Sequence, residues 1–178
     1  MKFIILDRDG VINQDSDDFI KSPEEFIPID GSIAAIAKLK QAGYQVVVAT
    51  NQSGISRGLY DLDILHRMHD KLQRLLQNEG VHLDGIFFCP HGPNDHCHCR
   101  KPKPGMYQDI AKRFNLDLSD VIVVGDSWRD LQAAIDVHAK PILVKTGKGE
   151  RTLKANKDDL INIPVFDSLA HFVDEHIS

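Results

Sequence analysis

The sequence predicts an α/β fold, a doubly wound parallel sheet within a single domain over residues 1–178. Short, continuously apolar runs alternate with longer segments whose apolar residues recur at helical spacing, as expected for buried parallel strands covered by helices. The length suits one domain. We find no internal repeat, low-complexity tract or linker that would divide the chain.

The expected strands are rich in β-branched or aromatic residues, such as the valines at positions 46–48. Two expected helices are followed by Gly43 and Gly80, since glycine commonly ends helices. Strands are expected at residues 3–6, 45–49, 85–89, 121–124 and 141–144, and helices at residues 32–39, 62–76, 106–114, 130–137 and 168–176. Residues 90–104 form a long irregular stretch, so we expect a functional loop or an internal staple there.

Composition excludes several classes of protein. The apolar fraction of 42% and the charged fraction of 26% are typical of globular chains and argue against disorder. The net charge of −5 makes nucleic acid and an anionic membrane poor partners. No run approaches the roughly 20 apolar residues of a membrane-spanning helix, and the apolar N-terminal stretch is too short for a signal peptide. We therefore expect a cytoplasmic protein. A small anionic substrate is still allowed, because a local cluster of cations can act against the net charge. We also expect a monomer.

Polar clusters follow three of the expected strands. They occupy residues 7–10 after the first strand, 50–54 after the second and 125–130 after the fourth. In doubly wound sheets, chemistry takes place at the carboxyl ends of the strands. We therefore expect the three clusters to form one site together with the basic segment at residues 100–103.

The residue types in these clusters indicate phosphoryl chemistry. The carboxylates of Asp7, Asp9 and Asp126 would make the oxygen-rich site that Mg²⁺ prefers, and the cation would offset their repulsion. A carboxylate such as Asp7 can attack phosphorus, while Asp9 can protonate the leaving oxygen and later activate water. Thr50 and the backbone N–H groups after it can hold phosphate oxygens, and a lysine can neutralise charge in the transition state.

These residues resemble the four motifs of the haloacid dehalogenase superfamily, in its phosphatase branch. The motifs are Asp7-x-Asp9-Gly10, Thr50, Lys101 and Gly125-Asp126-x-x-x-Asp130, and the resemblance runs from Asp7 to about Val144. More narrowly, residues 50–58 and 89–102 are similar to the D-glycero-D-manno-heptose-1,7-bisphosphate 7-phosphatase family. The resemblance implies a Rossmann-like fold with short loop caps and a phosphorylated sugar as substrate.

The same resemblance implies a role for each matching residue. Asp7 is the implied nucleophile and Asp9 the implied general acid and base. The implied Mg²⁺ ligands are the Asp7 carboxylate, the Asp9 carbonyl and Asp126. Thr50 and Lys101 are implied to hold the transferring phosphate. Substrate contacts are expected from Asn51, Gln52, Ser53, Arg100 and Asp15, with Arg100 as the second cation that a second phosphate needs.

Some positions leave alternatives open. Lys103 competes with Lys101 for the phosphate role, and Asp130 suits either a helix N-terminus or a partner for Lys101. The family pattern has a lysine directly after the aspartate of the last motif. This chain has Ser127 there, so that contact is missing or is supplied by another residue such as Arg129. Arg8 is expected to be structural, and the histidines outside the cysteine cluster to lie mostly on helix surfaces or in loops.

The cluster Cys89-x-His91-x5-Cys97-x-Cys99 supplies three thiols and one imidazole, which suits a closed, structural tetrahedral Zn²⁺ site. Such an ion would staple the long loop and position Arg100 and Lys101. His96 and His98 are expected to face solvent, although either can replace His91. The alternative interpretation is that the cluster binds no metal and consists of three reduced cysteines and a loop histidine.

Three other functions remain open at this stage. Histidinol-phosphate phosphatases carry a similar cysteine loop, and the five-residue spacing within it suits them, whereas residues 53–58 resemble the heptose enzymes. A broader phosphatase of small phosphoesters is also compatible with the motifs. A non-catalytic, zinc-stabilised binding module would require a broken set of carboxylates, and the set is complete.

Overall fold

The computed structural model describes residues 1–177, which contain a six-stranded, fully parallel sheet in the order β3-β2-β1-β4-β5-β6. The strands are β1 (Phe3–Leu6), β2 (Gln45–Asn51), β3 (Gly85–Cys89), β4 (Ile122–Gly125), β5 (Lys140–Val144) and β6 (Val165–Phe166). The helices are α1 (Ser32–Gln41), α2 (Leu62–Asn78), α3 (Gly105–Phe114), α4 (Trp128–Asp136), α5 (Gly149–Ala155) and α6 (Leu169–Ile177), with a 3₁₀ turn at Leu118–Asp120.

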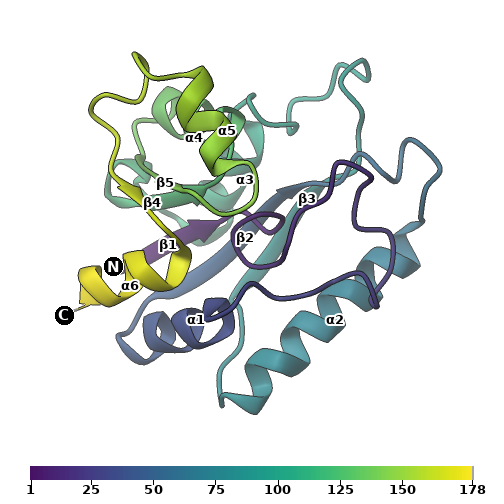
Figure 1. Ribbon diagram of the computed structural model, residues 1–178, viewed down its shortest axis with the longest axis horizontal. Helices are drawn as coiled ribbons and strands as arrows, with labels where there is room; N and C mark the ends of the chain where they lie inside the picture. Colours follow the sequence, from purple (N-terminus) through teal and green to yellow (C-terminus); the bar gives the residue numbers. More distant parts are fainter. Residues whose placement is uncertain (178) are drawn as a thin grey trace.

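Helices cover both faces of the sheet, as Figure 1 shows. All four residues of β1 are buried, and they alternate between two apolar clusters. Ile4 and Leu6 belong to the cluster that contains residues of α1, α2 and α6, whereas Phe3 and Ile5 belong to the one with α3 and α4. This alternation follows from the two-residue period of a strand and explains why β1 is apolar throughout.

The predicted fold class is confirmed, and each expected strand and helix is present with shifts of a few residues at its ends. The helix α5 and the strand β6 were missed. β6 has only two residues and α5 only seven, so neither has a hydrophobic periodicity long enough to be recognised in the sequence. β2 continues to Asn51 because Thr50 and Asn51 still pair with Phe88 and Cys89 of β3.

The topology gathers the three polar clusters at one edge of the sheet. β1 lies between β2 and β4, and Leu6 is in register with Val48 on one side and Val124 on the other. The segments that follow these strands therefore start side by side. No helix within residues 1–177 is long and apolar enough to cross a membrane.

Candidate active site

A cavity of about 200 Å³ opens at the carboxyl ends of the strands. Its walls include nine of the predicted site residues, namely Asp7, Asp9, Asp15, Asn51, Gln52, Ser53, Arg100, Lys101 and Asp126. Thr50 is fully buried beneath the cavity, where its hydroxyl accepts a hydrogen bond from Gln52 at 2.9 Å. The expected convergence of the three strand ends and the basic segment is therefore present.

Lys101 reaches the end of β1 from the long loop and is buried. Its Nζ lies 3.2 Å from Asp7 Oδ1, 2.6 Å from Asp130 Oδ1 and 2.7 Å from the carbonyl oxygen of Ala49. Burial alone would lower the pKa of Lys101, but the two carboxylates outweigh it and raise the pKa above its usual value. The ammonium group thus stays charged beside the predicted nucleophile. Lys103 instead donates to the carbonyl of Cys97 at 2.6 Å, on the exposed side of the loop.

Asp130 fulfils both roles that the sequence left open. One carboxylate oxygen pairs with Lys101, and the other accepts hydrogen bonds from the Ser127 hydroxyl and backbone N–H, closing a capping box at the start of α4. Although burial opposes ionisation, Lys101 holds the pKa of Asp130 below its usual value. Both oxygens of Asp130 are thus already engaged, and one of them supports Lys101.

The donor chemistry of Asp7 and Asp126 fits a hard divalent cation. Carboxylate oxygens of Asp7, Asp126 and Asp130 lie within 4.8 Å of one another. Burial, followed by the charge of Asp130, raises the pKa of Asp7 to about 7, and burial followed by the charge of Asp7 raises that of Asp126. Buried carboxylates that repel one another are stabilised by a cation between them, and Mg²⁺ uses one or two protein carboxylates together with water and phosphate.

Gly10 makes room for this arrangement. It has a φ of +85°, and a Cβ built on it would lie 1.9 Å from Oδ2 of Asp126. The same carboxylate oxygen accepts a hydrogen bond from the backbone N–H of Lys148 at 2.8 Å. The glycine after the two N-terminal aspartates is thus required both by the backbone and by the neighbouring carboxylate.

Both carboxylate oxygens of Asp9 accept hydrogen bonds. Its Oδ1 accepts hydrogen bonds from Arg8 and from Asn13 at 2.7 to 3.1 Å, and its Oδ2 accepts one from Gln52 at 2.8 Å. Burial raises the pKa of Asp9, but the charge of Arg8 and the hydrogen bonds from Asn13, Arg8 and Gln52 outweigh it and lower the pKa. The predicted acid and base therefore has a fixed orientation.

Two residues predicted to contact substrate also support the site through hydrogen bonds of their side chains. The Asn51 amide exchanges two hydrogen bonds with the backbone of Lys101, at 3.0 and 3.1 Å. Gln52 bonds Asp9 and Thr50 through Nε2, while its Oε1 accepts the hydroxyl of Tyr60. These contacts position Lys101 and Asp9. The contacts with Lys101 and with Asp9 link segments distant in the sequence, so no local pattern reveals them.

Besides Lys101, four basic side chains line the cavity, namely Arg57, Arg100, Arg129 and Lys148. Partial burial, and then the charges of Arg129 and Arg57, lower the pKa of Arg100. Lys148 lies 3.4 Å from Asp15, so Asp15 reaches the cavity already paired. Sequence reasoning missed Arg57 and Lys148 as cavity residues, although Arg57 belongs to the quoted segment 50–58.

His69 is an exception to the surface position expected for most of the histidines, because it lies on α2 but is only 7% exposed. Its Nε2 is 3.2 Å from Nη1 of Arg8. His96 and His98 are exposed, as expected, and His98 pairs with Asp109 at 2.9 Å. The periodic pattern of α2 did not separate His69 from its solvent-facing neighbours because histidine is common in both environments.

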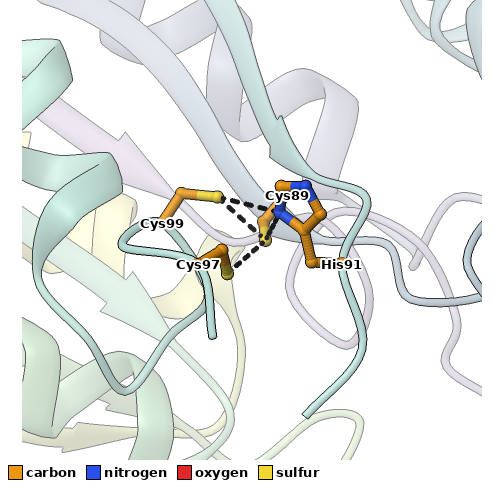
Figure 2. Close-up of side chains that lie close together, drawn as sticks. All are labelled: Cys89, His91, Cys97 and Cys99. Carbon is orange, nitrogen blue, oxygen red and sulfur yellow. Dashed lines mark hydrogen bonds between the residues drawn. The ribbon is translucent and has the colours of Figure 1, made fainter. Parts of the chain in front are cut away.

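Cys89 lies at the end of β3, and Cys97, Cys99 and His91 approach it from the loop that follows, as Figure 2 shows. The Cys89 sulfur is 3.7 Å from that of Cys97, and 3.5 Å separates His91 Nδ1 from the sulfurs of both Cys89 and Cys99. A tetrahedral Zn²⁺ with sulfur at about 2.3 Å requires about 3.8 Å between sulfurs and about 3.5 Å from sulfur to nitrogen.

The Cys89 and Cys99 sulfurs are closer, at 3.0 Å, but all three cysteines are free thiols. The four ligand atoms lie within 4.8 Å of one another. Three thiols and one imidazole are ligands typical of structural zinc. The residues present therefore fit a zinc ion.

Comparison with known proteins agrees with this geometry. The family model of haloacid dehalogenase-like hydrolases matches residues 1–138. The chain belongs to the haloacid dehalogenase-like hydrolase family. It is a phosphoric monoester hydrolase, as are the relatives described next.

Curated relatives are named D-glycero-beta-D-manno-heptose-1,7-bisphosphate 7-phosphatase. One from Bordetella bronchiseptica is 60% identical over 86% of each chain, and one from Pseudomonas putida is 54% identical over 99% of this chain and all of the relative. The solved D,D-heptose 1,7-bisphosphate phosphatase of B. bronchiseptica, complexed with magnesium and phosphate, superposes with a TM-score of 0.95 at 52% identity and covers 99% of this chain and 98% of its own.

Proposed function

We propose that this hydrolase removes the 7-phosphate of D-glycero-D-manno-heptose 1,7-bisphosphate, with Mg²⁺ and an aspartyl-phosphate intermediate. The observation that carries the proposal is the combination of two anion-binding regions in one cavity. In the first, Lys101 and the proposed Mg²⁺ would bind the phosphate that Asp7 attacks, and in the second stand Arg57, Arg100 and Arg129. A bisphosphate has a phosphate for each region, and the relatives' activity agrees with this assignment.

The chemistry divides between two carboxylates. Arg8 N–H and Lys101 both donate to Oδ1 of Asp7, so Oδ2 is the oxygen proposed to attack phosphorus. A new bond forms between this oxygen and phosphorus, the bond from phosphorus to the sugar oxygen breaks, and Asp9 gives that oxygen its proton. Asp9 then takes a proton from water as the water attacks phosphorus, which releases phosphate and restores Asp7.

Asp7, the Asp9 carbonyl and Asp126 are the proposed Mg²⁺ ligands. Bound there, the ion would neutralise the carboxylates and the phosphate oxygens. Lys101 adds a fixed positive charge where negative charge accumulates in the transition state. Because the pKa of Asp9 is lowered in the free protein, we propose that its proton arrives with the phosphate monoanion of the substrate, whose own pKa is close to 6.

A phosphate-release assay with Mg²⁺ tests the proposed substrate. We expect the highest kcat/KM with the heptose bisphosphate, compared with histidinol phosphate, sugar monophosphates and small alkyl phosphates. A higher kcat/KM with histidinol phosphate would replace the proposed substrate with the rival one. Similar values on all substrates would favour a broad phosphatase of small phosphoesters.

Replacing Arg100 with alanine is expected to reduce selectivity for the bisphosphate. The ratio of kcat/KM for heptose bisphosphate to that for heptose 7-phosphate should fall about 10-fold or more, because a charged hydrogen bond to the second phosphate is lost. Arg113→Ala, at an exposed position in the last turn of α3, is the matched control and should leave the ratio unchanged. An equal loss on both substrates would contradict the proposed role of Arg100.

We also propose that Cys89, His91, Cys97 and Cys99 hold a structural Zn²⁺. Removing one equivalent of zinc with a chelator is expected to lower Tm by at least about 6 °C, because metal binding contributes directly to folding. Turnover should fall as well, since Arg100 and Lys101 follow the last cysteine directly. Metal analysis before and after treatment checks the loss of zinc. An unchanged Tm after confirmed removal of stoichiometric zinc would contradict the structural role.

A further inference from the structure

Arg8 is a buried cation behind the proposed active site. Its side chain has no exposed surface, and its Nε and Nη2 both donate to Oδ1 of Asp9, at 3.1 and 2.7 Å. The ring of Phe26 lies 5.5 Å from the guanidinium carbon. A buried guanidinium needs acceptors for its remaining N–H groups, because an unpaired charged donor is costly away from water.

His69 on α2 supplies one of these acceptors. Nη1 of Arg8 lies 3.2 Å from His69 Nε2 and 3.7 Å from Met68 Sδ. A guanidinium can only donate, so His69 Nε2 must accept, which fixes the neutral tautomer with its proton on Nδ1. Burial, and then the charge of Arg8, lower the pKa of His69 to about 3, in agreement with this neutral state.

We propose that His69 is a positioning residue: it fixes the guanidinium of Arg8, which in turn orients the Asp9 carboxylate toward the leaving oxygen of the substrate. This inference rests on the proposed role of Asp9 as general acid and base. His69 does not line the cavity and acts through its contact with Arg8.

The hydrogen bonds around Asp9 show why its orientation depends on this contact. Three donors converge on Oδ1, two from Arg8 and one from Asn13, whereas Gln52 alone bonds Oδ2. Oδ2 is therefore the oxygen proposed to exchange the proton. Without the acceptor on α2, the guanidinium can turn to satisfy Nη1 elsewhere. The Asp9 carboxylate would then lose its fixed angle, and proton transfer depends steeply on such geometry.

The choice of leaving group separates this role from a purely structural one. An alkoxide needs a proton as it leaves, whereas p-nitrophenolate is a good leaving group without one. The quantity to compare is kcat/KM, because it covers the steps up to departure of the leaving group. His69→Leu is expected to lower kcat/KM for a sugar phosphate by about 10-fold or more, and for p-nitrophenyl phosphate by less than about 3-fold.

A matched set of variants completes the test. In His69→Gln the side-chain carbonyl can accept from Arg8, so kcat/KM for the sugar phosphate should return to within about 3-fold of wild type. His66→Leu makes the same change at an exposed position one turn earlier on α2 and should leave kcat/KM for both substrates unchanged. If His69→Leu does not fold, His69→Asn, which is too short to reach Arg8, takes its place beside His69→Gln.

The results with His69→Leu and His69→Gln separate a positioning role from a purely structural one. A selective loss on the sugar phosphate that glutamine restores supports the positioning role. Equal losses of kcat/KM on both substrates, or no loss on either substrate, overturn the positioning role. Heptose bisphosphate is assayed beside glycerol 3-phosphate. Wild-type turnover of only the latter would contradict the proposed substrate alone, and the alkyl-to-aryl comparison would then use glycerol 3-phosphate.

Discussion

Replacing Asp7 with asparagine is expected to abolish turnover while the protein stays folded. Without the carboxylate there is no nucleophile to attack phosphorus, so kcat should fall by at least about 10³-fold on every substrate. The change also removes a buried negative charge whose pKa burial and Asp130 raise to about 7. Above pH 7, in the absence of Mg²⁺, the variant should therefore unfold at a Tm no lower than that of the wild type.

Steady-state assays and thermal unfolding of the two proteins check this prediction. Asp136→Asn provides the control, since Asp136 is exposed at the end of α4, and this variant should keep wild-type activity. Residual turnover above the stated limit in pure Asp7→Asn would exclude Asp7 as the nucleophile.

Lys101→Met is expected to impair both stability and activity. Methionine retains much of the volume but leaves Asp130 buried without its partner, which costs about 3–5 kcal/mol in the free energy of unfolding. The transferring phosphate also loses the cation beside Asp7, so kcat/KM should fall by about 10²-fold or more. Denaturant unfolding and phosphate release measure the two effects.

A second substitution separates these two effects. In Lys101→Met with Asp130→Asn, the uncompensated charge is removed, so part of the lost stability should return while activity stays low. Lys103→Met tests the neighbouring lysine, whose ammonium group lies on the exposed side of the loop, and should change stability by less than about 1 kcal/mol. Full activity in Lys101→Met, or a larger loss of activity in Lys103→Met than in Lys101→Met, would show that Lys103 is the lysine that binds the phosphate.

Local patterns were sufficient for the parts of the fold that depend on neighbouring residues. The apolar run of β1 predicted a strand buried on both faces, and Asp7 and Asp9 directly after it predicted a site at its carboxyl end. The spacing from Cys89 to Cys99 likewise predicted a four-ligand cluster. In each case the residues that determine the feature lie close together in the chain.

The features of the site that the sequence did not predict depend on contacts that only the folded chain creates. Arg8 contacts His69 although 61 positions separate them. Nothing in the sequence around His69 distinguishes an acceptor for a buried guanidinium from a surface histidine. Asn51 and Gln52 follow the same principle: their side chains belong to the predicted cluster, but their partners come from other segments.

Detection of a phosphoryl group on Asp7 tests the central claim most directly. The wild type and Asp9→Asn are mixed with substrate and Mg²⁺, quenched in acid within the first turnover, and analysed by mass spectrometry of the peptide that contains residue 7. With p-nitrophenyl phosphate, whose leaving group departs without a proton from Asp9, we predict a phosphorylated Asp7 in both proteins, with greater accumulation in Asp9→Asn because water is no longer activated. Substrate turnover without any phosphorylated peptide, or with the phosphoryl group on another residue, would contradict the mechanism.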